Sequence, residues 1–231
     1  MRTMGIIGGI GPESTVEYYR LIIAGYRERR PDSGEPSIII DSIDMRRLLQ
    51  AIESGDLAGA TDYLTVELER LARAGADVGL PASNTPHIVF DELRRRSPLP
   101  LISIVESACS AARQRGLRRL GLLGTRFTMR GRFYQDVFSA AGITLEVPEP
   151  DERAYVHEKY LGELVKGLIV PETRRHLSAI VAALKQDHGI DGLILGGTDL
   201  SVMFPEDIVC GVPVLDTARI HVNAAVAALG E

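Results

Sequence analysis

The sequence has only two cysteines, Cys109 and Cys210, and no apolar run near the roughly 18 residues of a membrane span. Two such distant cysteines give neither a metal-ligand spacing nor a disulfide framework, so we expect no metal and a reducing cytoplasm. Glycines, Pro12 and Glu13 interrupt the apolar N-terminus too early for a secretion signal, and we interpret it as a buried strand and loop.

Basic charge is also scarce. The formal net charge is −5, and the runs "YRERR" and "LRRRSP" have the pattern of solvated helix ends. We therefore expect no nucleic-acid partner and no membrane partner. The composition of 45% hydrophobic and 25% charged residues is that of an ordinary soluble globular protein, and 231 residues suit one large or two small domains.

Short apolar segments alternate with amphipathic ones along the chain. The segments "MGIIGG", "SIIIDS", "ADVGLPAS", "PLISIV", "RLGLLG", "ITLEVP", "DGLILGG" and "VPVLDT" have strand character, and patterns such as "TDYLTVELERLARAG" repeat every three or four residues. Apolar strands separated by helices predict an α/β fold with parallel sheets covered on both faces.

The order of these segments repeats with an offset near 114 residues. "MGIIGGIGPESTVEYYRLI" corresponds to "LGLLGTRFTMRGRFYQDVF", "ADVGLPASNTPH" to "IDGLILGGTDLS", and "SPLPLISIVESACSAA" to "CGVPVLDTARIHVNAA". The repeat predicts two Rossmann-like domains related by a pseudo-twofold. We assign residues 1–100 and 212–231 to the first and residues 101–211 to the second.

Ligands of open parallel sheets bind outside the carboxyl ends of the strands. We therefore expect a small-molecule cleft between the two domains. Four loops are expected to open onto it: residues 8–14, 83–87, 125–129 and 197–201.

Two of these loops follow the first strand of each half. Gly9 and Gly11 lie in "GIIGGIGPES", which lacks the G-x-G-x-x-G spacing of dinucleotide-binding sheets, so we favour a tight turn whose amides approach a carboxylate. The second half offers Thr125 and Thr128 at the same place. Thr128 is either a ligand-binding hydroxyl or a plain helix N-cap.

The other two loops carry "SNTPH" and "GGTD". Asn84, Thr85 and Thr198 either bind a ligand or cap the helix that follows, and both roles can hold together. His87 is either a base or a structural histidine. Asp199 either ionises toward the ligand or caps its own loop.

Outlying candidates complete the set. Lys166 either reaches an anionic ligand or is a surface lysine at a helix end. Arg46 and Arg47 follow a strand, and one of them, for which we choose Arg47, could hold a second carboxylate in a bidentate fork. We expect Cys210 to be an inert core or edge thiol and Cys109 to be buried packing.

Five stretches together resemble the aspartate/glutamate racemase family over essentially the whole chain. They are "MGIIGGIGPESTVEYYRLI", "ASNTPHIVFDEL", "GLLGTRFTM", "DGLILGGTDL" and "VPVLDTARIH". The resemblance implies a cofactor-independent enzyme of two α/β domains that binds an acidic amino acid or related dicarboxylate, and a homodimer.

The family's usual mechanism uses one cysteine as thiolate base and another as thiol acid on the two faces of the substrate Cα. The first falls on Ser83 in the C-N-T-x-H motif, and the second falls on Gly197 in the G-C-T-E motif. Asn84, Thr85 and Thr198 match, Asp199 replaces a glutamate, and Lys166 matches a substrate-binding lysine.

Two hypotheses follow. The first is a racemase, or a related isomerase or lyase, with Ser83 at the proton-transfer position and Asp199 or His87 supplying basicity. The second is an inactive racemase fold that binds a dicarboxylate. A third, dinucleotide binding, is weakened by the missing glycine fingerprint and the lack of an acidic residue for the ribose.

Overall fold

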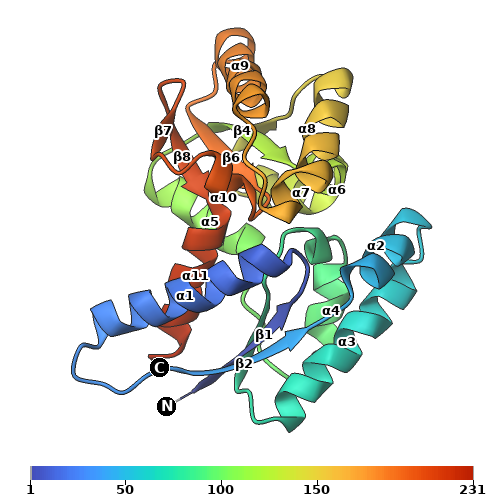
Figure 1. Cartoon of the computed structure of the whole chain (residues 1–231), viewed down its shortest axis with the longest axis vertical. Helices are drawn as coiled ribbons and strands as arrows, with labels where there is room; N and C mark the ends of the chain where they lie inside the picture. Colours follow the sequence, from blue (N-terminus) through green and yellow to red (C-terminus); the bar gives the residue numbers. More distant parts are fainter. Residues whose placement is uncertain (1, 231) are drawn as a thin grey trace. The chain divides into compact units, whose positions relative to one another are not determined.

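The computed structural model describes residues 2–230, which divide into two compact α/β units (Figure 1). Unit 1 comprises the chain up to Ser103 and the segment from His221 onward, and unit 2 is Ile104–Ile220. Within residues 2–230, no helix has the length and apolarity needed to cross a membrane.

Unit 1 is built on a parallel sheet of order β2-β1-β3. Its strands are β1 (Thr3–Gly8), β2 (Ser37–Ser42) and β3 (Val78–Pro81). Its helices are α1 (Pro12–Arg29), α2 (Met45–Glu53), α3 (Leu57–Arg73), the 3₁₀ helix η1 (Thr85–Val89) and α4 (Phe90–Arg96). Figure 1 shows α2 and α3 side by side next to this sheet.

Unit 2 is built on a sheet of order β5-β4-β6-β8-β7, in which β7 alone is antiparallel. The strands are β4 (Arg119–Gly124), β5 (Thr144–Glu146), β6 (Gly192–Gly196), β7 (Ile208–Val209) and β8 (Val212–Asp216). The helices are α5 (Ile104–Gln114), α6 (Arg126–Arg130), α7 (Arg132–Ala140), α8 (Pro150–Gly162), the 3₁₀ helix η2 (Leu164–Lys166), α9 (Pro171–His188) and α10 (Leu200–Met203). Helix α11 (Thr217–Ala228) begins in unit 2, and its residues from His221 onward belong to unit 1.

Strand β6 shows why the apolar segments are continuous rather than alternating. Leu193 and Leu195 belong to a core cluster with α8 and α9, whereas Ile194 lies in the cluster formed with α5 and α7. Successive side chains of a strand point to opposite faces, so both faces of this sheet are buried. The predicted parallel α/β fold is confirmed.

The two sheets repeat the same internal order. In unit 1, Leu101 extends the order β2-β1-β3 through a parallel bridge to Gly79, and in unit 2 β8 extends the order β5-β4-β6. The predicted strand "PLISIV" is therefore wrong in extent. Only a short stretch pairs with β3, through the Gly79 amide to the Pro100 carbonyl and the Ile102 amide to the Gly79 carbonyl, because helix α5 already begins at Ile104.

The assignment of residues 212–220 to the first domain is also wrong. Strand β8 pairs with β6, and Leu215 lies in the core of unit 2. These contacts hold the segment in unit 2 up to Ile220, and the first boundary falls after Ser103 rather than residue 100.

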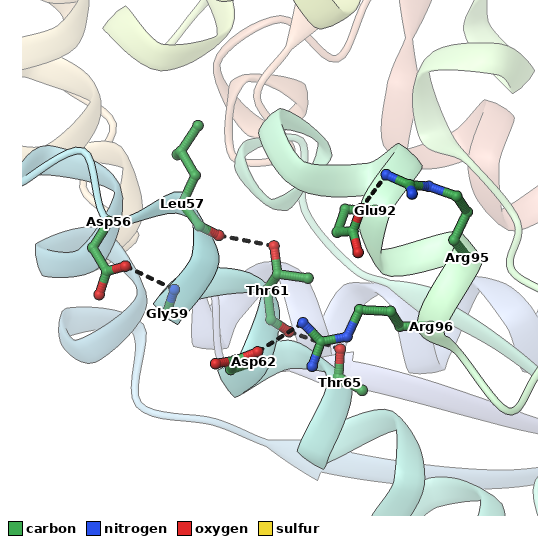
Figure 2. A network of polar contacts seen from close by, with 9 residues as sticks. All are labelled: Asp56, Leu57, Gly59, Thr61, Asp62, Thr65, Glu92, Arg95 and Arg96. Carbon is green, nitrogen blue, oxygen red and sulfur yellow. Dashed lines mark hydrogen bonds and ion pairs between the residues drawn. The ribbon is translucent and has the colours of Figure 1, made fainter.

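Helix α4, which follows the polar loop of β3, is held against α3 by an ion pair (Figure 2). Arg96 Nη1 lies 2.7 Å from Asp62 Oδ1. At the start of α3, Asp56 caps the helix by accepting a hydrogen bond from the Gly59 amide at 2.8 Å. The ion pair thus links α4, the helix beyond this loop, to α3, whose first turn is capped by Asp56.

Candidate functional site

The turn between β1 and α1 requires glycine at two positions. Gly9 and Gly11 have φ values of +80° and +94°, which lie in the left-handed region. A Cβ on Gly9 would also lie 2.5 Å from the carbonyl oxygen of Ile43. The turn therefore passes against the backbone that follows β2, and only glycine fits there.

The polar groups of this turn bond to one another. The Gly9 amide donates to Thr15 Oγ1 at 2.9 Å, and the hydroxyls of Thr15 and Ser14 donate to the Gly11 carbonyl at 3.1 and 2.8 Å. The sequence predicts that the amides of this turn approach an anion, but the Gly9 amide donates to Thr15 instead.

Ser83, Asn84, Thr85 and His87 follow the carboxyl end of β3 and are all buried. The Ala82 amide donates to the Ile7 carbonyl at 2.9 Å, which holds the start of this loop against β1. Asn84 occupies the N-cap position of η1, yet its side chain makes no capping bond. The capping role that the sequence left open for Asn84 is therefore not seen.

Two buried histidines lie behind this loop. The ring of His87 stacks on Phe90 with centroids 4.4 Å apart, and burial, with a smaller contribution from His221, lowers the pKa of His87 to about 3. His221 Nε2 lies 3.0 Å from the Ile102 carbonyl, and its Nδ1 lies 2.9 Å from the Tyr18 hydroxyl. A carbonyl only accepts, so Nε2 carries the proton and Nδ1 accepts from Tyr18. Burial lowers the pKa of His221 to about 4, so both rings are neutral at pH 7.

In unit 2 the turn after β4 carries Thr125 and Thr128, both buried. Thr125 holds the N-cap position of α6, so the alternative that made Thr128 the N-cap is wrong. Thr128 lies inside the helix and packs on two strand ends, since a Cβ on Gly124 or Gly196 would lie 3.0 or 2.9 Å from its carbons. The two threonine hydroxyl oxygens are 3.4 Å apart.

The position after β6 is closed by an aromatic ring. A Cβ on Gly197 would lie 2.4 Å from Cε2 of Tyr160 and 2.9 Å from its hydroxyl oxygen. Real Cβ atoms essentially never approach so closely. The Tyr160 ring, which comes from α8, therefore fills the space that a side chain at position 197 would need.

The same tyrosine binds Asp199. Its hydroxyl donates to Asp199 Oδ2 at 2.6 Å, and the Asp199 amide lies 3.3 Å from the phenol oxygen. Thr198 makes a further side-chain hydrogen bond to this phenol. Tyr160, Thr198 and Asp199 are all buried, so they form one polar cluster at the carboxyl end of β6. Asp199 holds the N-cap position of α10, where its side chain makes no helix-capping bond.

The charged candidates lie at the surface. Arg47 is exposed on α2, with its guanidinium carbon 4.2 Å from the ring centroid of Tyr63, and Arg46 is an exposed neighbour paired with Asp44. Lys166 is exposed at the end of η2.

Both cysteines are free thiols. Cys109 is buried in α5, where burial raises its pKa, as expected for a packing residue. Cys210 is exposed, with its Sγ 3.3 Å from the Ser178 carbonyl. In the part of the chain from residue 2 to 230, no group of three or more His, Cys, Asp or Glu residues could hold a metal ion.

Sequence reasoning missed Tyr160, Thr15 and the Tyr18–His221 pair. Tyr160 lies in a helix with no motif around it. Thr15, Tyr18 and His221 lie in stretches that carry the family resemblance, but nothing in those stretches indicates which residue each side chain contacts. The glycine pair Gly196–Gly197 was the available signal, because successive glycines at a strand end often mark the close approach of another group.

The strand order shared by the units, with buried polar loops after β3 and β6, defines a duplicated α/β protein whose polar loops lie at the carboxyl ends of parallel strands. The model of the family Asp/Glu/hydantoin racemase matches residues 7–225. The chain therefore belongs to the Asp/Glu/hydantoin racemase family.

Solved structures agree with this assignment. A candidate Asp/Glu racemase from Yersinia pestis is 31% identical with a TM-score of 0.90, and each chain is covered completely. An aspartate racemase homologue from Pyrococcus horikoshii OT3 is 32% identical with a TM-score of 0.85, again with complete coverage of both chains. The fold is also that of the glutamate racemase from Francisella tularensis subsp. tularensis in complex with D-glutamate, at 15% identity, a TM-score of 0.70, and coverage of 99% of this chain and 81% of that one.

Proposed function

We propose that this protein is a racemase-family enzyme that moves a proton at the α carbon of aspartate, glutamate or a similar dicarboxylate. The observation that carries the proposal is the family match over residues 7–225. The buried hydroxyl and amide groups after β3 and β6 support it, since a desolvated carboxylate needs such hydrogen-bond donors.

Substrate binding is assigned to the loop residues. We propose Asn84 and Thr85 of unit 1, and Thr125, Thr128 and Thr198 of unit 2, as substrate-binding residues. Arg47 and Lys166, as exposed cations, are the candidates for a second carboxylate. Gly9 and Gly11 serve by shaping the turn, since the Gly9 amide already donates to Thr15.

Positions 83 and 197, where the family resemblance places the two cysteines, carry no thiol. We therefore assign proton transfer to Ser83 itself and to Asp199, the acidic residue nearest in sequence to position 197. A serine hydroxyl is a poor base unaided, and glycine offers no titratable group. Burial lowers the pKa of His87 to about 3, so its imidazole is a weak base at pH 7.

A second candidate is a dicarboxylate-binding protein without racemase activity, or a divergent isomerase or lyase on the same fold. The closure of position 197 by Tyr160 favours it, because a side chain there has no room beside that ring. In that case the buried polar loops would bind the ligand, and no thiol would be needed because no proton is transferred.

Proton NMR in D2O separates these candidates. Purified protein is incubated with L- and D-aspartate and with L- and D-glutamate, and loss of the α-proton signal is followed over time. We expect exchange that is lost in Ser83→Ala. Unchanged α-proton signals, combined with a thermal stabilisation by the same ligands, would refute proton transfer and favour binding alone.

We also propose a homodimer in a reducing, cytoplasmic compartment. The family resemblance supports the first point, and the two free thiols support the second. Analytical ultracentrifugation tests the dimer, and a single species with the mass of one 25.1 kDa chain would refute it.

A further inference from the structure

The need for glycine at position 197 comes from the neighbouring Tyr160 ring and not from an unusual backbone conformation. The φ of Gly197 does not lie in the left-handed region, whereas those of Gly9 and Gly11 do. The Tyr160 ring is what excludes a side chain, with Cε2, Cζ and the hydroxyl oxygen all within 2.9 Å of the Cβ that any other residue would have. The Tyr160 ring thus occupies the volume that a side chain at position 197 would need, and glycine leaves that volume to the ring.

Tyr160 also brings a polar group to the place where position 197 has none. Its hydroxyl lies in the same volume and donates to Asp199 Oδ2 at 2.6 Å. Both side chains are buried, so this bond fixes the carboxylate far better than an exposed contact would. Burial and the charge of Asp199 raise the pKa of the phenol well above its usual value, so Tyr160 keeps its proton and remains the donor.

We propose that Tyr160 and Asp199 replace the acid/base side chain that position 197 lacks, with Asp199 as the proton-transfer group and Tyr160 as the residue that positions it. This inference rests on the proposed function, proton transfer at an amino-acid α carbon. The Cα–H bond breaks, its electron pair stays on the substrate and delocalises into the α-carboxylate, and the proton moves to a carboxylate oxygen of Asp199. The protonated Asp199 exchanges with solvent and returns a proton or deuteron to the carbon.

The test compares Tyr160→Phe with the wild type in the D2O exchange assay. Phenylalanine keeps the ring beside Gly197 and removes only the hydroxyl. We expect the maximal exchange rate to fall about tenfold or more while KM stays within about twofold, because the lost bond holds a charged group and not the substrate. Asp199→Asn should abolish exchange.

Tyr155→Phe is the matched control. Tyr155 lies on the same helix and stacks on His176 with centroids 4.0 Å apart, outside the Asp199 cluster. Equal rates in Tyr160→Phe, Tyr155→Phe and wild type would overturn the inference while leaving the proposed function standing. A wild type that shows no exchange would overturn the proposed function itself, and the inference with it.

A stability cycle tests the volume argument without any activity. Gly197→Ala should lower the Tm, and the same change in a Tyr160→Ala background should cost much less, because the ring that blocks the new methyl is gone. Equal costs in both backgrounds would show that the ring does not exclude a side chain at position 197.

Discussion

Gly9 and Gly55 have nearly the same φ, +80° and +78°, but different surroundings. A Cβ on Gly9 would meet Ile43 backbone atoms at 2.5 and 2.7 Å, whereas a Cβ on Gly55 would meet nothing within 4 Å. Gly55→Ala should cost the left-handed penalty of about 1–2 kcal/mol, and Gly9→Ala should cost clearly more. Chemical denaturation of both variants measures the difference, and equal losses would show that the turn yields easily.

The buried histidines predict a loss of stability in acid. Folding lowers the pKa of His221 from 6.5 to about 4, so the neutral ring contributes stability above pH 6.5 that is lost as pH falls toward 4. A shift of this size corresponds to on the order of 3 kcal/mol. We expect the Tm of the wild type to fall steeply over this range and that of His221→Gln to fall less. Parallel curves would show that His221 does not titrate with unfolding.

Single residues of the candidate site could be predicted where they lie in a local motif. The run Ser83 to His87 and the run Gly197 to Asp199 follow apolar strands, and the structure places them, buried, at the ends of β3 and β6. Tyr160 could not be predicted, because its contact with Asp199 joins residues 39 positions apart. The periodicity of a helix does not reveal which distant residue one side chain will meet.

Helix α3 carries a buried glutamate whose burial works against the fold at neutral pH. Burial, followed by the neighbouring Asp41 of β2, raises the pKa of Glu67, and Arg70 opposes this only in part. The stability contributed by the protonated Glu67 is fully present below about pH 4.5, the usual pKa of the group. It is lost as pH rises through the raised pKa of the folded state. Glu67→Gln should therefore raise the Tm by a few degrees at pH 8 and have little effect at pH 4.

The matched control is Glu69→Gln on the same helix. Glu69 is half exposed and pairs with Arg73, so we expect its replacement to change little at either pH. Glu67 also forms an ion pair with Arg70. A Glu67→Gln variant that is less stable than wild type at pH 8 would show that this ion pair outweighs the burial of the charge.

Elements could be predicted well where apolar runs were long and less well where pairing was short. Strands β2, β4, β6 and β8 fall within the segments chosen from the sequence, and β1 begins one residue before its segment. The segment "PLISIV" has the same composition, yet it forms a single bridge before α5 begins, and the two-residue strand β7 was not expected. Composition alone does not show at which residue an apolar segment stops pairing as a strand and begins the next helix.

At the scale of the whole molecule, α11 serves both units. Its first turn lies in unit 2, while His221, Val222, Val226 and the following Leu229 are buried in unit 1. Ending the chain at Ile220 should therefore unfold unit 1 and leave the core of unit 2 in place. Hydrogen exchange should show fast amides in β1 and β3 and retained protection in β4 and β6. Unchanged protection in β1 would show that unit 1 needs no terminal segment.

This arrangement sets the order in which the protein can be completed during synthesis. The ribosome makes most of unit 1 first, but the partner of Tyr18, His221, is 203 positions away and emerges last. Unit 2 is continuous from Ile104 to Ile220 and has all of its residues while unit 1 still lacks its final helix. Unit 1, although most of it is made first, therefore cannot be completed until the segment after Ile220 has been made.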